Sequence, residues 1–373
     1  MLDILNLKPE AFGLDISDLS LKIVKLKKKG KFLSLASFGE TKISPGILTE
    51  GEVKDEKKLA QIIKESVKNI TGEKLKTKYV VSSLPEEKTF LQVIQMPKMK
   101  EEELKKAVLF EAENYIPLPI DQVYLDSQIV PQLYDHLDHS DVLILALPKK
   151  IVDPYLFSIK SAGLQPLAFE IESQAIARAL IKNELSESPA LLIDLGAGRT
   201  SFIIFSGYSL KFTSSIPISS QGFNEVISRS LGVNNEKAEE LKREYGLQEN
   251  IKLKKDDGKT KDGEIFEALI PSLTDLIEQI KKYLSYYQTH ALHEHSLPNN
   301  KGVKKILLSG GGANLKGLDD FLSLELKIPV EVANPWVNIL PSQIKELPQL
   351  PFEKSLSFTT ALGLALRAIK THD

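Results

Sequence analysis

The chain has 373 residues, of which 42% are apolar and 26% charged, and its formal net charge is −2. This length exceeds one typical core, so we expect two lobes, and the charge balance argues against a general nucleic-acid binder because no basic excess neutralises phosphates. Cysteine is absent, which excludes disulfides, thiolate catalysis and cysteine-bound zinc.

The N-terminal part reads as the start of an α/β domain. Alternating apolar residues predict strands at 12–16, 21–27 and 32–41, with a hairpin turn at 28–31. A helix is predicted over 56–70, closed by Gly72, and a further strand over 78–82.

A block with its own local pattern follows. It reads as a strand at 90–96, a helix at 99–115, paired strands at 123–130 and 142–147, and a helix at 150–162. We interpret residues 84–167 as a small inserted α/β domain, with an acidic, histidine-containing loop at 134–141.

The remaining chain returns to long elements. We expect helices over 172–182, 221–231, 236–245, 266–290, 315–324 and 359–369, and a buried strand over 305–308. The charged stretch 248–263 is predicted to be an exposed loop. The first nine residues lack the pattern of a signal peptide, and no stretch approaches 18 uninterrupted apolar residues, so we expect a cytoplasmic protein.

Two aspartates, each at the end of a strand predicted to be buried, indicate a ligand-binding site. Asp15 stands in a turn with Ser17, Ser20 and Lys22, and Asp194 stands before Gly196, Gly198 and Thr200. Such turns let backbone N–H groups approach a phosphate, and the carboxylates can hold the accompanying Mg²⁺ through water. A plain solvent-edge turn is the alternative for the first hairpin, because short motifs recur often.

A third glycine-rich motif follows the strand at 305–308. Its members Gly310, Gly311, Gly312 and Asn314 stand between a buried strand and a helix, where a flat ring or a phosphate can lie. Alone, this run is also compatible with an ordinary strand-to-helix turn.

The order of these motifs resembles the actin, Hsp70 and sugar-kinase ATPase superfamily, with two phosphate motifs and one adenosine motif. The resemblance implies an actin/Hsp70/ribonuclease H-like two-lobed α/β fold that binds ATP and Mg²⁺ between the lobes. A further match is Ala238-Glu239-Glu240-Leu241-Lys242, which implies contacts from Glu239 and Lys242 to the ribose and adenine. Their i, i+3 spacing places both on one helix face, although a solvated charged helix has the same pattern.

The inserted block and the final helix resemble the PilM family of type IV pilus assembly proteins, which is related to FtsA. The carrying residues are the stretch 101–125 and Ala361-Leu362-Gly363-Leu364-Ala365-Leu366-Arg367. The resemblance implies a first actin-like half at 10–83 and 168–188, an SHS2-type (1C) insertion at 84–167, a second half at 189–233 and 301–373, and a subdomain at 234–300. Small residues at 175, 361 and 363 are expected to permit close crossing of two helices.

The resemblance also implies partners and a location. It predicts binding of the cytoplasmic N-terminal peptide of PilN, coupling to the pilus motor ATPases, self-association, and peripheral association with the inner membrane through partners. Plausible walls of the peptide groove are Leu91, Val93, Ile94, Val108, Phe110 and Ala112. An FtsA-like division scaffold that polymerises with ATP and a small-molecule kinase remain alternatives.

Two departures concern catalysis. Ser17 stands where the family usually has glycine, and a serine fits there only if its φ is negative. The adjacent carboxylate of Asp18 would repel the phosphates unless Mg²⁺ lies between them. Hydrolysis needs a residue that orients the attacking water, and Glu172 is the candidate, with Gln174 beside it. We therefore expect ATP binding and leave turnover open.

Overall fold

The computed structural model describes residues 9–30, 32–131, 138–247, 252–254, 260–262, 264–290, 302–341 and 347–370. The chain is mixed α/β, as predicted, and divides into two compact units. Unit 1 comprises Met1–Ser186, Phe205–Thr213 and Asn334–Asp373, and unit 2 comprises Glu187–Ile204 and Ser214–Ala333. Across the described residues, none of the helices combines the length and the apolar character that crossing a bilayer demands.

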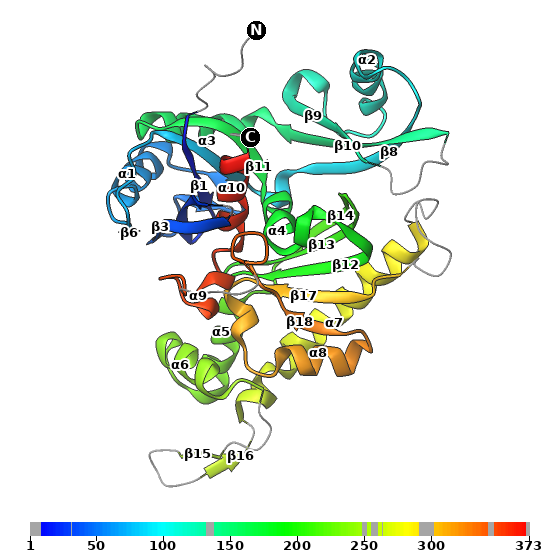
Figure 1. The fold of residues 1–373 in the computed structure, drawn as a ribbon. Helices are drawn as coiled ribbons and strands as arrows, with labels where there is room; N and C mark the ends of the chain where they lie inside the picture. The colour runs from blue at the N-terminus through cyan, green and yellow to red at the C-terminus, as the bar shows by residue number, and fades with distance from the viewer. Residues whose placement is uncertain are drawn as a thin grey trace. The chain divides into compact units, whose positions relative to one another are not determined.

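Unit 1 is built on a six-stranded sheet with the strand order β11-β7-β1-β2-β3-β6 (Figure 1). The strands are β1 (Ala11–Ile16), β2 (Ser20–Lys29), β3 (Phe32–Lys42), β6 (Thr71–Gly72), β7 (Tyr79–Leu84) and β11 (Gln165–Ile171). β1 and β2 form an antiparallel hairpin, whereas β7 runs parallel to both β1 and β11. The three predicted N-terminal strands are thus confirmed.

Two pairs of helices pack on this sheet. The helices α1 (Glu56–Ser66) and α3 (Lys149–Ser161) contact each other, and α4 (Glu172–Leu180) packs with α10 (Thr359–Lys370), which lies on β1 and β2. α1 ends four residues before the predicted end. Gly72 does not close it: this glycine pairs with β3 at a φ of 98°, where a Cβ would lie 2.4 Å from the Ala36 carbonyl oxygen.

The crossing of α4 and α10 depends on small residues, as predicted. A Cβ on Gly363 would lie 1.8 Å from the Ala175 carbonyl oxygen, and one on Gly13 of β1 would lie 2.5 Å from the Ala361 carbonyl oxygen. The C-terminal segment from Asn334, with α9 (Phe352–Leu356) and α10, therefore belongs to unit 1. The sequence expectation had grouped this segment with the second half.

The inserted block forms its own three-stranded antiparallel sheet in the order β8-β10-β9. It comprises β8 (Phe90–Pro97), α2 (Glu101–Ala112), β9 (Val123–Ile129) and β10 (His139–Pro148). The helix at its predicted end, α3, packs instead on α1, where Ser158 Oγ donates to the Glu56 carbonyl oxygen at 3.2 Å. The separate sheet therefore spans Phe90–Pro148, which is narrower than 84–167. Residues 134–137 of the expected loop 134–141 lie outside the described residues, and its last three residues belong to β10.

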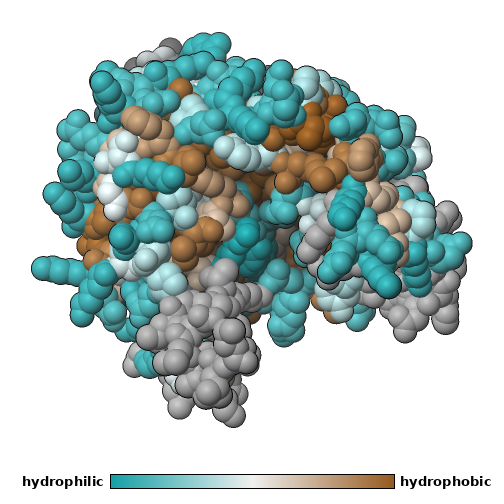
Figure 2. All heavy atoms as spheres, turned by 90° about the horizontal axis from the view of Figure 1, so that it is seen from above, coloured by the Kyte–Doolittle hydropathy of each residue, from teal (hydrophilic) through white to brown (hydrophobic). Residues whose placement is uncertain are grey.

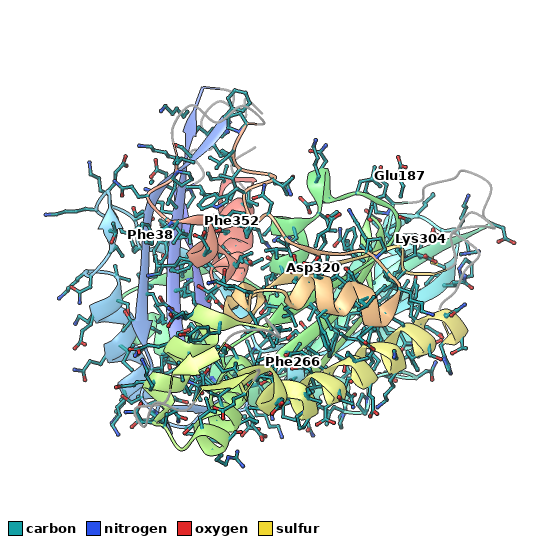
Figure 3. All side chains as sticks on the ribbon, turned by 90° about the horizontal axis from the view of Figure 1, so that it is seen from below. Phe38, Glu187, Phe266, Lys304, Asp320 and Phe352 are labelled. Carbon is teal, nitrogen blue, oxygen red and sulfur yellow. The ribbon has the colours of Figure 1, made fainter. Side chains whose placement is uncertain are left out.

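A second sheet has five strands in the order β14-β13-β12-β17-β18, and most of its residues belong to unit 2. Its strands are β12 (Ser186–Leu195), β13 (Thr200–Gly207), β14 (Ser209–Ile216), β17 (Lys305–Ser309) and β18 (Val330–Val332). The helices of unit 2 are α5 (Ser220–Leu231), α6 (Asn235–Tyr245), α7 (Glu264–His290) and α8 (Leu318–Leu326). Figure 3, which labels Phe266, shows α7 alongside α8, where the Phe266 and Phe321 ring centroids lie 6.0 Å apart.

Three short elements depart from the sequence expectations. The stretch predicted as a loop contains an antiparallel pair, β15 (Lys252–Lys254) and β16 (Thr260–Asp262). The helix predicted at 315 begins at Leu318, after a 3₁₀ turn at Gly311–Asn314. A further pair, β4 (Leu48–Thr49) and β5 (Glu52–Val53), carries a turn that matters for the site below.

Candidate functional site

The first aspartate hairpin lies in unit 1, where Asp15 is the next-to-last residue of β1 and its carboxylate is buried. Its Oδ1 accepts a hydrogen bond from Ser83 Oγ at 3.1 Å, and Lys22 is its cross-strand partner in the register of β1 and β2. Burial raises the pKa of the Asp15 carboxyl, and the charge of Lys22 and the Ser83 hydroxyl offset this only in part. A bound cation would favour the ionised form of this buried carboxyl, so the position of Asp15 fits a cation site.

The two residues that departed from the family pattern are accommodated locally. Ser17 is not among the described residues with positive φ, and its N–H and hydroxyl both donate to the Ser20 carbonyl oxygen, at 2.9 and 3.0 Å. Asp18 accepts from the backbone N–H groups of Glu50 and Gly51 at 2.8 and 3.0 Å. The Asp18 carboxylate is therefore held by the β4–β5 turn. Lys22 Nζ donates to Ser20 Oγ at 2.7 Å, which closes this hairpin.

A buried glutamate beside this hairpin was missed by the sequence reasoning. Glu86 follows β7, and its Oε2 accepts from the backbone N–H of Ser173 at 3.2 Å, in the first turn of α4. Burial raises the pKa of Glu86, and Ser173 and Thr213 offset this in part. The candidate Glu172 is the first residue of the same helix and is half-buried. A carboxylate directly after a buried strand, in Leu84-Pro85-Glu86, was the available signal.

The second aspartate hairpin lies in unit 2, where Asp194 stands near the end of β12. Its Oδ1 accepts from Ser309 Oγ at 2.8 Å, and the two residues are neighbours in the parallel pairing of β12 with β17. This pairing brings the second aspartate motif and the glycine-rich motif to the same sheet edge, because parallel strands end together.

The glycines of these two motifs allow a close approach of backbone to backbone. Gly310 has a φ of 81°, and a Cβ on it would lie 2.4 Å from the Leu195 carbonyl oxygen. A Cβ on Gly312 would lie 2.4 Å from Leu195 Cγ, and one on Gly196 would lie 2.9 Å from the Arg199 carbonyl oxygen. Larger side chains would therefore push the glycine-rich turn away from the aspartate turn.

The aspartate turn is also joined to helix α5. The carbonyl oxygens of Gly196 and Ala197 accept from the backbone N–H groups of Ser220 and Gln221, at 3.0 and 3.1 Å. Thr200 Oγ1 donates to the Ile218 carbonyl oxygen at 2.7 Å, just before α5. These contacts fix the turn against the start of the helix.

Helix α6 carries Glu239 and Lys242, the two residues predicted to contact the nucleoside. Hydrogen bonds connect it to the start of α5 and so to the aspartate turn. Lys242 Nζ lies 2.9 Å from Glu239 Oε2 and donates to the carbonyl oxygen and Oγ of Ser220, at 3.0 and 2.7 Å. Burial lowers the pKa of Lys242, although Glu239 opposes this. Burial would raise the pKa of Glu239, but bonds from Lys242, Asn224 and Arg243 outweigh it and hold that pKa low.

The candidate residues thus fall into two groups. In unit 2, hydrogen bonds and close packing join Asp194, Gly196, Gly310, Gly312, Lys242 and Glu239 through Ser309, Leu195 and Ser220. In unit 1, Asp15, Ser17, Ser20 and Lys22 form the other group. Asn314 makes a local contact, because its Nδ2 donates to the Gly311 carbonyl oxygen at 3.2 Å.

The residues predicted to line the peptide groove lie on different faces of the insertion. Ile94, Val108 and Ala112 are buried in the core between α2 and the sheet, so they are unavailable to a peptide. Phe110 on α2 is 76% exposed, and Figure 2 shows apolar patches among polar side chains on the face seen from above. Leu91 and Val93 alternate with that core along β8 and are half-buried on the other face of the sheet.

Comparisons with known proteins agree with this architecture. The sequence model of the family described as "Type IV pilus assembly protein PilM" matches residues 13–369. The chain is similar to a solved structure described as "PilM-PilN type IV pilus biogenesis complex", with 29% identity, a TM-score of 0.76, and coverage of 96% of this chain and 98% of that one.

More distant similarities support the fold. MreB5 of Spiroplasma citri bound to ADP has a TM-score of 0.54 at 14% identity, covering 98% of each chain. Cell division protein FtsA of Buchnera aphidicola subsp. Acyrthosiphon pisum (strain APS) is 26% identical over 176 residues, 43% of this chain. The chain matches only 41% of the length of that curated relative. The fold is therefore actin-like, as the motif order predicted.

Proposed function

Since the chain belongs to the PilM family of type IV pilus assembly proteins, we propose that it is the ATP-binding component of the pilus assembly platform at the cytoplasmic face of the inner membrane. The bonded group of Asp194, the glycine-rich turn and Lys242 in unit 2 carries this proposal. It joins the second phosphate motif, the adenosine motif and the nucleoside helix, as a nucleotide site of this superfamily requires.

Each residue of the group has a proposed role. The turns at Asp15 and Asp194 hold the phosphates, and their carboxylates hold Mg²⁺ through water. Glu239 and Lys242 contact the nucleoside, while Gly310–Gly312 provide a surface without side chains. Bound Mg²⁺ would supply charge compensation for the phosphates. Glu172, at the start of α4, is the proposed water-orienting residue if ATP is turned over.

Calorimetric titration with Mg-ATP tests the nucleotide site. Asp194→Ala is expected to reduce affinity at least tenfold, about 1.4 kcal/mol. Ser309→Ala is the matched control, because it removes the 2.8 Å hydrogen bond to Asp194 and leaves the carboxylate in place. Equal affinity of Asp194→Ala and the natural protein would contradict the proposal.

The proposed partner is the cytoplasmic N-terminal peptide of PilN, named from the similarity to the PilM–PilN complex. We place its contact on the face of the insertion sheet opposite α2, where Leu91 pairs with Leu145 and Val93 with Leu143. Leu91, Val93 and Leu145 are half-buried there, which leaves apolar surface for an extended peptide with apolar anchors.

Two single variants distinguish the faces of the insertion. Val93→Asp is expected to weaken binding of a synthetic PilN tail at least tenfold, because a charge replaces an apolar contact. Phe110→Ser, on the exposed side of α2, is expected to leave binding unchanged. Weaker binding by Phe110→Ser together with unchanged binding by Val93→Asp would place the peptide on the α2 side instead. Coupling to the motor ATPases and self-association are part of the same proposal.

A further inference from the structure

The β4–β5 turn is the point at which separate parts of unit 1 meet. Its residue Gly51 is buried, and the Gly51 N–H donates to Asp18 Oδ1, in the turn of the first aspartate hairpin, at 3.0 Å. The Gly51 carbonyl oxygen accepts from Tyr155 Oη of α3, also at 3.0 Å. Hydrogen bonds on both sides of one residue therefore join the aspartate hairpin to the helix that follows the insertion.

Gly51 has little room to move independently of its neighbours. Its φ is 73°, and a Cβ on it would lie 2.5 Å from Pro85 Cβ and 3.0 Å from Glu87 Oε1. Pro85 directly follows β7, the strand whose Ser83 donates to Asp15. Because close-packed interiors are hardly compressible, a glycine in this position transmits a displacement of the hairpin instead of absorbing it.

Tyr155 is a lasting donor to the Gly51 carbonyl oxygen. Its side chain is 1% exposed. Burial raises the pKa of the Tyr155 hydroxyl well above its ordinary value, and the negative charges of Glu172 and Asp18 raise it further. The hydroxyl therefore keeps its proton at physiological pH. Since these two carboxylates belong to the start of α4 and to the aspartate hairpin, Tyr155 also lies within electrostatic range of the residues proposed to act on phosphate.

Helix α3 connects Tyr155 directly to the insertion. β10 ends at Pro148 and α3 begins at Lys149, so no loop residue separates the strand from the helix. β10 is the central strand of the insertion sheet, and its Leu143 and Leu145 lie on the face proposed for the PilN peptide. A tilt of α3 therefore changes the orientation of that face.

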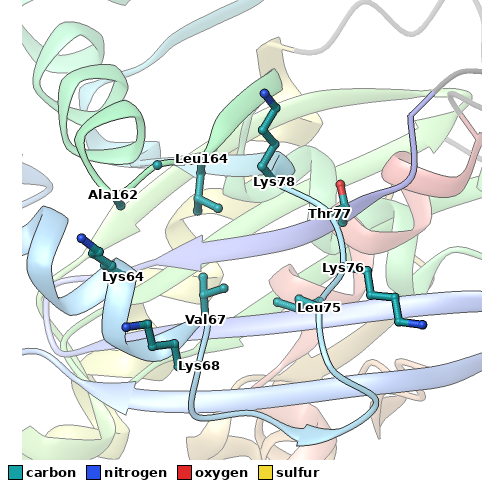
Figure 4. A pocket seen from close by; sticks show the side chains of 10 residues that line it. Lys64, Val67, Lys68, Leu75, Lys76, Thr77, Lys78, Ala162 and Leu164 are labelled. Carbon is teal, nitrogen blue, oxygen red and sulfur yellow. The ribbon is translucent and has the colours of Figure 1, made fainter.

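The far end of α3 has room to follow such a tilt. A shallow depression of about 400 Å³ lies at the C-terminal ends of α1 and α3, beside the extended segment before β7 (Figure 4). Its lining includes Val67 after α1, and Ala162, Gly163 and Leu164 after α3. A Cβ on Gly163 would meet nothing within 4 Å. Packing is thus close around Tyr155 and open beyond the end of the helix, which favours rotation of α3 about its Tyr155 end.

We propose that the β4–β5 turn couples nucleotide binding at the first aspartate hairpin to the peptide face of the insertion. The hairpin shifts when it closes on phosphate, Asp18 moves Gly51 with it, and Gly51 moves Tyr155 and α3. Chains of packed groups and hydrogen bonds carry coupling of this kind. Tyr155 is a positioning residue, since it contacts neither ligand. The coupling rests on the proposed function, because it links the ATP site and the peptide face proposed above.

The test compares the affinity for a synthetic PilN tail between nucleotide-free and ATP-saturated full chain, by calorimetry. The natural chain should show at least about a fivefold difference. Tyr155→Phe keeps the buried ring and removes only the hydroxyl, so it should reduce the difference to less than about twofold. Its nucleotide-free tail affinity, and its Mg-ATP affinity without the tail, should each stay within about threefold of the natural values.

Asp18→Ala breaks the other side of the same link and should also reduce the difference to less than about twofold. Because the two hydrogen bonds act in series, the double variant should lose no more coupling than either single variant. Tyr283→Phe is the matched control, because it removes a tyrosine hydroxyl that lies 2.8 Å from Ser214 Oγ within unit 2. This control should keep the full difference.

Three results would overturn the coupling: a full difference in Tyr155→Phe, tail affinities of the natural chain that do not depend on ATP, or an equal loss in Tyr283→Phe. The last would mean that any lost tyrosine hydrogen bond suffices. All three leave the proposed function standing, since ATP and the tail can each bind without influencing the other. A natural chain that binds no ATP or no tail would instead overturn the proposed function, and the coupling with it.

Discussion

The hydrogen bonds of Asp18 assign its carboxylate a structural role. Its carboxylate accepts from Glu50 and Gly51 N–H, so it caps the β4–β5 turn. We therefore predict that Asp18→Asn changes Mg-ATP affinity less than twofold. Asp18→Ala should lower the free energy of unfolding by about 1 to 2 kcal/mol, because two backbone donors lose their acceptor. Tighter ATP binding by Asp18→Asn would show instead that the carboxylate faces the phosphates.

The raised pKa of Glu86 makes the free energy of unfolding depend on pH in a definite direction. Burial raises its pKa, so the folded chain keeps the proton to a higher pH than the unfolded chain does. The free energy of unfolding then falls as the pH rises from 4.5, the ordinary glutamate pKa, through the raised folded value.

Glu86→Gln should therefore stabilise the protein at pH 7 by about 1 to 3 kcal/mol, because it removes a buried charge and keeps an acceptor for the Ser173 N–H. The gain should vanish below pH 4.5, where the carboxyl is protonated in both states. Thermal unfolding across pH measures this, with exposed Glu102→Gln as control. A gain that does not change with pH would contradict the assignment.

At the scale of elements, the crossing of α4 and α10 holds the C-terminal segment in unit 1. Gly363→Ala should lower the free energy of unfolding by about 3 kcal/mol, because its Cβ would lie 1.8 Å from the Ala175 carbonyl oxygen. Chemical denaturation measures the loss. Gly222→Ala in α5 is the matched control, since the added Cβ would lie 3.4 Å from Ser219 Oγ and alanine favours helix. Similar values for the two variants would show that the helices separate readily.

The insertion shows which element boundaries a sequence pattern can place. The strand, helix and two strands at Phe90–Pro148 were predicted, but α3 was assigned with them because it follows β10 directly. Its buried face, including Tyr155 and Ile159, packs outside the insertion sheet, and Tyr155 Oη donates to the Gly51 carbonyl oxygen at 3.0 Å. An amphipathic pattern indicates that one face of a helix is buried, but it does not indicate which other element covers that face.

At the scale of the whole molecule, the two aspartate motifs belong to different units, Asp15 to unit 1 and Asp194 to unit 2. If one nucleotide contacts both, Asp15→Ala and Asp194→Ala should each reduce affinity at least tenfold. The double variant should lose less than the sum of the two free-energy changes, since interacting sites are not additive. Calorimetry of the three variants is the measurement. Unchanged affinity in one single variant would confine the site to the other unit.

The same division predicts coupling between sites. A ligand that contacts two units shifts the population of their arrangements only if it binds those arrangements with different affinity. We expect the affinity for the PilN tail to differ at least fivefold between nucleotide-free and ATP-saturated protein. Asp194→Ala should abolish that difference while leaving the nucleotide-free affinity intact. Equal affinities in both states would leave peptide binding independent of nucleotide.

Much of this molecule follows from local sequence. The turn residues around Asp15 and Asp194, the apolar strands before them and the glycines after β17 depend on backbone preferences that neighbouring residues set. These features predicted an actin-like fold, and the stretch 101–125 with the final helix predicted a PilM-like chain. The family match and the structural similarities bear out both predictions.

Only the tertiary structure decided where side chains from distant segments meet. It placed Asp18 on the β4–β5 turn, Ile94 and Val108 in the insertion core, Glu86 at the start of α4 and α10 on unit 1. Each of these depends on contacts between residues that are far apart in the chain. Hydrophobic burial is non-directional, so an apolar face can be recognised in a sequence, while its partner is selected by packing of the folded chain.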